Sequence, residues 1–186
     1  QVKVPSQVAG KLKMPPIVSG EAPEFVRKVT AEIIAQRGDN LPVSAIPNDG
    51  TWPTGTTQWE KRNIAVEIPR WDPSVCIQCL TCSTVCPHAV IRGKVYDADK
   101  LEGAPATFKS TDAKTKEFEG KKFTLQVAPE DCTGCGACVH ACPMKAKGAI
   151  KMTEQIPLRE AEAENFKFFL DIPEYDRSKL NLATVK

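Results

Sequence analysis

The stretch DCTGCGACVHACP, residues 131–143, contains four cysteines at spacings of three, three and four residues, and a proline follows the last of them. The stretch VCIQCLTCSTVCP, residues 75–87, repeats this arrangement. All eight cysteines of the chain lie in these two stretches: Cys76, Cys79, Cys82, Cys86, Cys132, Cys135, Cys138 and Cys142. So concentrated a pattern predicts that the cysteines share one chemical role.

Two common uses of cysteine fit this pattern poorly. Disulfides join distant segments, and cysteines three residues apart in one loop can scarcely form useful bridges. Structural zinc uses two CxxC pairs, but a tetrahedral site has no use for a third cysteine three residues further on. A cubane iron-sulfur cluster does use it, because one loop can offer thiolates to three of its irons. The motifs therefore predict iron-sulfur clusters.

The cysteine before each proline predicts how two clusters share their ligands. In the bacterial run CxxCxxCxxxCP, the fourth cysteine binds the other cluster of a pair. We therefore expect two [4Fe-4S] clusters with crossed ligands. The predicted ligands of cluster one are Cys76, Cys79, Cys82 and Cys142. The predicted ligands of cluster two are Cys132, Cys135, Cys138 and Cys86.

The residues between the cysteines differ in the two motifs. Gly134 and Gly136 let backbone N–H groups come close to cluster sulfur, where such hydrogen bonds tune the reduction potential. The first motif carries larger side chains in its loop: Ile77, Gln78, Leu80 and Thr81. We expect the two clusters to differ in reduction potential, but the sequence does not indicate which cluster has the higher one.

The flanking segments predict an α+β fold. FTLQV, residues 123–127, alternates before the second motif, and a short helix from Val139 and the strand GAIKMTE, residues 148–154, follow it. IAVEI, residues 64–68, and AVIRGKVYD, residues 89–97, flank the first motif in the same way. Each half reads as strand, cluster loop, helix, strand, which predicts a ferredoxin-like domain with a pseudo-twofold (βαβ)2 repeat over residues 63–158.

The connection between the halves is long and polar. Residues 97–122 carry many charges and almost no hydrophobic pattern. They are expected to form a solvated excursion, and the alternative is a docking surface for a neighbouring domain or partner.

Residues 1–62 hold no cysteine and are predicted to form a linking segment. Five apolar residues of APEFVRKVTAEIIAQRG, residues 22–38, share one face of a packing helix: Phe25, Val26, Val29, Ile33 and Ile34. Gly38 is placed to end this helix.

The loop NDGTWPTGTTQWEKR, residues 48–62, has glycines spaced as in a phosphate-binding loop. Thr56 stands where such a loop needs its lysine, so we expect a rigid loop anchored by Trp52 and Trp59 instead. No Ser, His and Asp constellation can be assembled, because the only histidines are His88 and His140. Each lies beside a cluster motif and either tunes a cluster or has no role.

Composition sets broad limits. The 25 basic and 23 acidic residues give a formal net charge of +2, which gives no argument for a nucleic acid or membrane partner. No apolar run approaches the roughly 20 residues of a membrane span, and the start lacks the apolar region of a signal peptide. We expect a cytoplasmic protein and, because the chain begins at Gln1, a piece of a longer polypeptide.

The order of these segments resembles the middle of pyruvate:ferredoxin oxidoreductase, also called pyruvate:flavodoxin oxidoreductase. The similarity covers nearly the whole chain and rests on GTWPTGTTQWEKRNIAVEIPRWDPSVCIQC, both cysteine motifs and NFKFFLDIPEYDR. The resemblance implies a linking domain marked by Glu60, Lys61 and Arg62, then the two-cluster domain, then a connector over residues 159–186. The segment with the EKR sequence and the FKFFLDIPEYDR tail are the selective parts.

The resemblance also implies a function. The parent enzyme would decarboxylate pyruvate oxidatively, form acetyl-CoA and reduce ferredoxin or flavodoxin, in anaerobic metabolism and as a homodimer. Its thiamine diphosphate, Mg and third [4Fe-4S] cluster would lie in other segments, so this chain is predicted to relay electrons and to hold no catalytic residue. The alternatives are a stand-alone ferredoxin-like carrier and the iron-sulfur subunit of another oxidoreductase, such as a hydrogenase.

Basic residues near the motifs are candidates for steering an acidic partner. They are Arg92, Lys94, Lys145, Lys147 and Lys151. The alternative is that these are ordinary solvated charges.

Overall fold

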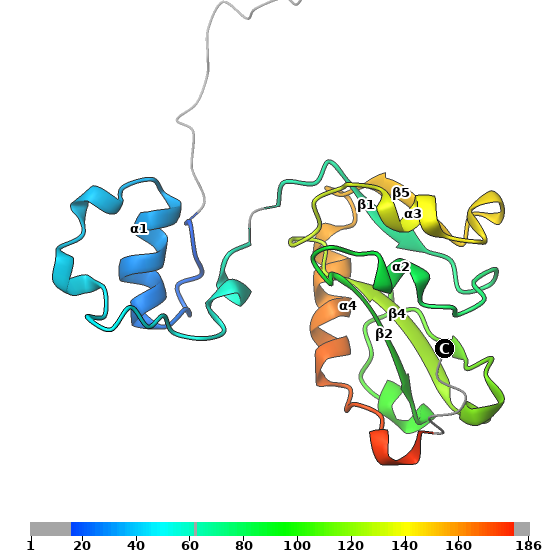
Figure 1. Ribbon diagram of the computed structural model, residues 1–186. Coiled ribbons are helices and arrows are strands. Elements are labelled where there is room, and N and C mark those ends of the chain that lie inside the picture. The colour runs from blue at the N-terminus through cyan, green and yellow to red at the C-terminus, as the bar shows by residue number, and fades with distance from the viewer. Residues whose placement is uncertain (1–15, 62, 181–186) are drawn as a thin grey trace, which may run out of the picture. The chain divides into compact units, whose positions relative to one another are not determined.

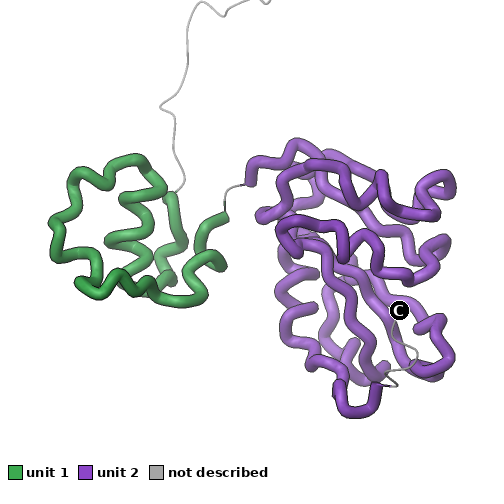
Figure 2. Tube along the Cα trace, viewed as in Figure 1, with its two compact units in different colours: residues 1–61 green, residues 62–186 purple. Residues whose placement is uncertain are grey.

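The computed structural model describes residues 16–61 and 63–180 of the chain. The chain divides into two compact units, residues 1–61 and residues 62–186 (Figure 2). Across the described ranges, no helix is both long enough and apolar enough to cross a membrane.

The first unit is built around one short helical segment. A π-helical turn, Val26–Thr30, leads directly into α1, Ala31–Ile34. Three 3₁₀ turns follow at Gly38–Asn40, Val43–Ala45 and Thr56–Trp59. The core of the unit is small: Val18, Ala22, Val26 and Ala31, with Ile34 and Trp59 packed against it.

The helix differs from its sequence prediction in two respects. Val26 and Val29 are buried as expected, but Ile33 is 45% exposed and Ala31 lies inside instead. A π turn spans one residue more than an α turn, so it rotates the following residues away from the face that an α-helical repeat predicts. The helix also ends before Gly38, because Gln36 adopts a φ of 58°.

The loop that contains Trp52 and Trp59 packs against the core of the first unit at Trp59, as predicted. Trp59 contacts the small core, whereas Trp52 stays partly exposed and packs edge-on against Phe25, with ring centroids 4.9 Å apart. Gly55 has a φ of 74° before the last 3₁₀ turn, and its carbonyl oxygen accepts a hydrogen bond from Gln58 Nε2.

The second unit repeats the order strand, loop, helix, strand (Figure 1). The first half contains β1 (Glu67–Trp71), α2 (Thr81–Thr84) and β2 (Ile91–Tyr96). The second half contains β4 (Lys122–Val127), α3 (Ala137–Ala141) and β5 (Ile150–Glu154). The helix of the second half begins at Ala137, two residues before the expected start at Val139.

The strands form two antiparallel sheets, each combining both halves. β1 pairs with β5, so that Trp71 lies opposite Ile150. β2 pairs with β4, and the two-residue strand β3 (Thr111–Asp112) adds to the other edge of β4. Each of these two pairings therefore joins one strand from each half.

The first strand lies three residues later than predicted. Ile64 and Val66 were expected in a strand over residues 64–68, but both are exposed. β1 instead includes Pro69, which has no N–H to donate. A two-stranded sheet has only edge strands, and there a proline is tolerated.

The sheet around β4 is buried on both faces. Phe123, Leu125 and Val127 join the main core, together with Ile68, Ile91 and Ile150. The alternate residues Thr124 and Gln126 are also buried, and their side chains bond to the backbone oxygen of Lys109. Long helix α4 (Arg159–Asp171) packs beside this sheet and buries Asn165 and Phe169 (Figure 1).

The connection over residues 97–122 is packed against the domain, which differs from the expected solvated excursion. It contains β3 and two 3₁₀ turns, Ala98–Leu101 and Lys116–Phe118. Phe108 packs edge-on against Phe168 of α4 at 4.9 Å. Thr107 Oγ1 and Asn165 Oδ1 are 3.0 Å apart in a hydrogen bond. The composition of residues 97–122 predicted a solvated segment because the few apolar residues in it follow no regular spacing.

Two further 3₁₀ turns complete the second unit. Lys145–Lys147 joins α3 to β5, and Arg177–Lys179 follows α4. Asp176 caps the second of these turns, since its Oδ1 accepts from the backbone N–H of Ser178 at 3.0 Å.

Candidate iron-sulfur site

The two cysteine loops share one backbone conformation. The second and fourth residues after the first cysteine have positive φ in both loops: Gln78 at 59° and Leu80 at 57°, Gly134 at 71° and Gly136 at 72°. Glycine adopts this conformation freely, whereas other residues pay about 1–2 kcal/mol for it. The first loop therefore keeps a strained shape that its sequence does not favour, which is typical of a functional site.

This conformation turns backbone amides toward sulfur. The N–H of Gln78 donates to Cys76 Sγ at 3.3 Å, and the N–H of Gly134 donates to Cys132 Sγ at 3.4 Å. The two hydrogen bonds occupy the same position in each loop. A backbone N–H therefore donates to the first cysteine in both loops, including the loop without glycine.

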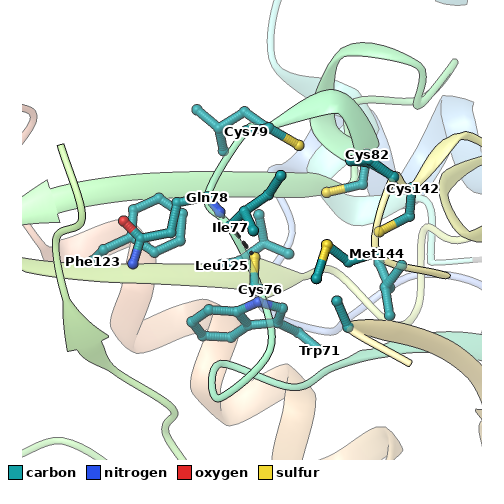
Figure 3. Close-up of a pocket in the computed structure, with 14 residues that line it drawn as sticks. Trp71, Cys76, Ile77, Gln78, Cys79, Cys82, Phe123, Leu125, Cys142 and Met144 are labelled. Atoms are coloured by element: carbon teal, nitrogen blue, oxygen red, sulfur yellow. Dashed lines mark hydrogen bonds between the residues drawn. The ribbon is translucent and has the colours of Figure 1, made fainter. Parts of the chain in front are cut away.

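The cysteines gather in two pockets that each draw on both motifs. Cys76, Cys79 and Cys82 line one pocket together with Cys142 from the second motif (Figure 3). Cys132, Cys135 and Cys138 line the other together with Cys86 from the first motif. The two pockets are alike in size, with a cavity volume of about 20 Å³ in each.

The short helices α2 and α3 carry the fourth cysteine of each motif away from its own loop. The two helices contact each other, and Cys142 follows directly after α3. Pro143 lines the pocket of Cys76, and Pro87 lines the pocket of Cys132. The helices thus place each cysteine-proline pair at the other motif's pocket.

Apolar side chains form most of the remaining walls. The pocket of Cys76 is lined by Trp71, Phe123, Leu125, Met144 and Ile150, among others. The pocket of Cys132 is lined by Pro69, Val90, Ile91, Ala137 and Met152, among others. Ile77 also lines the pocket of Cys76, and it is 48% exposed.

Burial changes the acidity of the innermost thiols. It raises the pKa of Cys82 to about 12, with a further contribution from the nearby Cys76. It raises the pKa of Cys138 to about 11 and also raises that of Cys132. These thiols hold their protons at neutral pH, so binding to iron must release them.

The donor set fits an iron-sulfur cluster. Each pocket offers four thiols, and no carboxylate appears among the described residues that line either pocket. Soft sulfur donors select iron-sulfur clusters or zinc. Within residues 16–61 and 63–180, no three His, Cys, Asp or Glu side chains converge closely enough to hold a single metal ion. The four thiols of each pocket line one shared cavity.

The connection over residues 97–122 holds the first cysteine loop. Gln78 Nε2 donates to the oxygen of Asp112 at 2.8 Å, and Gln78 Oε1 accepts from the N–H of Lys114 at 2.8 Å. Lys114 Nζ donates to the backbone oxygen of Cys76 at 2.6 Å. These long-range contacts support the strained φ of Gln78, and nothing in the local sequence predicted them.

The two histidines occupy different places. His88 is exposed and lines the pocket of Cys132. His140 is exposed on α3 and does not line either cysteine pocket as described, although its backbone oxygen accepts from Lys145 Nζ at 3.3 Å.

One basic residue expected at a docking surface is buried. Lys94 is 9% exposed, and its Nζ donates to the backbone oxygens of Phe169 and Ile172. A lysine so enclosed cannot steer a partner, so the expectation for Lys94 is wrong. Arg92, Lys145, Lys147 and Lys151 are exposed.

Models of known protein families match two parts of the chain. Residues 68–143 match the model of a 4Fe-4S dicluster domain. Residues 11–65 match the model of a domain of unknown function called EKR. The matched dicluster region contains all eight cysteines, so iron-sulfur clusters are the cofactors of this chain.

Several known proteins are similar over most of the chain. A pyruvate-flavodoxin oxidoreductase of Trichormus variabilis is 57% identical over 89% of the chain, and one of Nostoc sp. is 52% identical over 100%. A pyruvate:ferredoxin oxidoreductase of Moorella thermoacetica is 46% identical over 100% of the chain. The chain spans only 14–16% of the length of these relatives.

Proposed function

Because the chain belongs to the family of pyruvate-flavodoxin oxidoreductases, we propose that it is the part of such an enzyme that relays single electrons through two [4Fe-4S] clusters. The observation that carries this proposal is the pair of cysteine pockets of similar size, each with four thiols and apolar walls. Each cluster, when bound, supplies a site that accepts and releases one electron.

The proposed ligands follow the pockets. Cluster one is bound by Cys76, Cys79, Cys82 and Cys142. Cluster two is bound by Cys132, Cys135, Cys138 and Cys86. Support comes from the lining of the two pockets and from the matching amide hydrogen bonds of Gln78 and Gly134. The crossed ligands would join two halves related by a pseudo-twofold (βαβ)2 repeat.

The arrangement suits transfer between the two clusters. Cys138, which lines the other pocket, is near enough to Cys82 to add to the rise in the pKa of Cys82. The apolar walls reduce contact with water, which limits the reorganisation that accompanies a change of charge. The role of this part of the chain is therefore to set the distance between the two clusters and their reduction potentials.

The reaction of the whole protein is proposed from its relatives. It would oxidise and decarboxylate pyruvate, form acetyl-CoA and pass electrons to flavodoxin or ferredoxin, as a cytoplasmic homodimer. Thiamine diphosphate, Mg and a third cluster would be held by segments other than this one. Within the chain, residues 1–62 would form a linking segment. Residues 63–158 would bind the two clusters, and residues 159–186 would form a connector to a further domain.

The test is direct analysis of the chain purified without oxygen. We expect about eight irons and eight acid-labile sulfides per chain, a broad visible absorption that dithionite bleaches, and EPR signals from two reduced clusters. Bound zinc without sulfide would refute the proposal. The chain alone should not decarboxylate pyruvate when thiamine diphosphate and coenzyme A are added.

A stand-alone carrier is the second candidate, and the cluster chemistry is the same in both cases. The surrounding reading frame separates them. Sequence for thiamine diphosphate binding in the same frame supports the oxidoreductase, and a start codon immediately before Gln1 supports the carrier.

A further inference from the structure

Trp71 lies against the pocket of the first cysteine loop. It is the last residue of β1, it is 4% exposed, and its side chain lines the pocket of Cys76, Cys79, Cys82 and Cys142. Sequence reasoning assigned no role to Trp71, whereas it expected Trp52 and Trp59 to anchor a loop. Trp71 can therefore contact a cluster that these four thiols bind.

The indole nitrogen of Trp71 has no hydrogen-bond acceptor among the described residues, although it is buried. Leaving a buried donor unsatisfied costs about 1–3 kcal/mol. Among the buried side-chain atoms that lack a partner in the described part of the chain, this is the one that belongs to a residue of a cysteine pocket. Figure 3 shows the indole nitrogen on the side of the ring that faces the sulfur of Cys76.

The ring is held in this orientation from several sides. Phe123 packs edge-on against it, with ring centroids 5.9 Å apart. The backbone oxygen of Trp71 accepts from Lys109 Nζ at 2.7 Å, and its strand position lies opposite Ile150. These contacts fix both the backbone and the ring, so the N–H cannot turn toward water.

The pocket of the second loop lacks a matching donor. Both pockets have one backbone amide bonded to the first cysteine, at 3.3 and 3.4 Å. The side-chain donors among the described lining residues of the second pocket are His88, which is exposed, and Thr133, which is half-buried. Neither is buried without a partner, so the indole distinguishes the two sites.

We propose that Trp71 donates a hydrogen bond from its indole N–H to a sulfur of cluster one and thereby makes cluster one easier to reduce than it would otherwise be. This rests on the proposed function. Reduction adds one negative charge to the cluster, and a donor aimed at sulfur stabilises the more negative form. The effect is strongest in an apolar pocket, where water does not screen it.

The test compares two tryptophan variants in the full chain loaded with its clusters. Trp71→Phe keeps an aromatic ring and removes the N–H, and Trp59→Phe makes the same change in the other unit. Redox titration followed by EPR measures both potentials. Cys79→Ser and Cys135→Ser identify which signal belongs to which loop, because each of these cysteines belongs to one local CxxCxxC run.

We expect Trp71→Phe to lower the reduction equilibrium constant of the Cys79-dependent cluster about tenfold, or about 59 mV for one electron. The Cys135-dependent cluster should keep its potential, and Trp59→Phe should change neither. Equal potentials in Trp71→Phe and the unaltered chain would overturn the inference, as would a shift confined to the Cys135-dependent cluster. An unaltered chain that assembles no clusters would instead overturn the proposed function.

A second measurement needs no substitution and covers the case in which Trp71→Phe fails to assemble. The unaltered chain is labelled with ¹⁵N at its indole nitrogens and studied by pulsed EPR in the reduced state. A ¹⁵N coupling on the Cys79-dependent signal would support the hydrogen bond, and its absence would rule the bond out.

Discussion

Lys94 Nζ lies 3.0 Å from the backbone oxygen of Phe169, and the two residues belong to β2 and α4. The same nitrogen donates to the oxygen of Ile172 at 2.5 Å and lies 4.7 Å from the centre of the Phe169 ring. The last carbonyls of a helix have no donor within the helix. Lys94 of β2 therefore donates to two backbone oxygens at the C-terminal end of α4 and holds this end of the helix against the sheet.

Replacing Lys94 should loosen this end of α4. Lys94→Met keeps most of the apolar stem and removes a donor shared by two buried oxygens, so we expect a loss of about 2–4 kcal/mol in the free energy of unfolding. Urea unfolding of the cluster-loaded chain measures the loss, and hydrogen exchange of the α4 amides locates it. Lys100→Met is the control, because Lys100 pairs with Asp99 at the surface and should matter little. Equal effects of the two substitutions would contradict the role of Lys94.

Two glycines of the second cysteine loop should differ in their tolerance of a side chain. Gly134 and Gly136 have nearly the same positive φ, so alanine strains both. A Cβ on Gly134 would also come within 3.2 Å of the backbone oxygen of Glu67, whereas a Cβ on Gly136 would meet nothing within 4 Å. Gly134→Ala should therefore lower the iron content and the thermal stability of the second cluster more than Gly136→Ala does. Visible absorption during heating checks this, and equal losses in the two variants would show that φ alone governs the loop.

Removing the clusters should unfold most of the second unit. Cys132 and Cys138 are part of its main hydrophobic core, and cluster ligation joins both halves of a small domain. After iron and sulfide are stripped, we expect the amide resonances of residues 63–180 to collapse to narrow dispersion, while part of the first unit keeps its helix. Full native dispersion in the stripped chain would mean that the core stands without its cofactors.

Sequence spacing predicted the order of the elements because each half is governed by local patterns. The cysteine spacing, the alternation of residues 123–127 and the apolar run after Cys86 all report on neighbouring residues. Relationships set by distant partners escaped prediction. β1 spans Glu67–Trp71, and not the predicted residues 64–68, because it pairs with β5. Lys94 is buried because α4 ends beside it.

The candidate site was predictable to a similar degree. The eight cysteines follow from composition and spacing, but the donors around them do not. Trp71 lies five residues before Cys76, outside the motif, and its sequence carries no sign that its N–H is left without an acceptor. The contacts of Gln78 with residues 112 and 114 depend on a connection that composition alone had marked as solvated.

The crossed ligands give the final prediction, which compares single cysteine variants by EPR. If each motif held its own cluster, Cys86→Ala would damage the cluster of Cys76. Crossed ligation predicts damage to the cluster of Cys132 instead, because Cys86 lines that pocket. Loss of one thiolate should leave a three-iron or labile cluster at the affected site. Cys86→Ala and Cys132→Ala should therefore alter the same signal, and Cys76→Ala the other. Cys142→Ala provides the reciprocal control, since it should group with Cys76→Ala. If Cys86→Ala grouped with Cys76→Ala, each loop would bind its own cluster, and the crossed assignment would have to be abandoned.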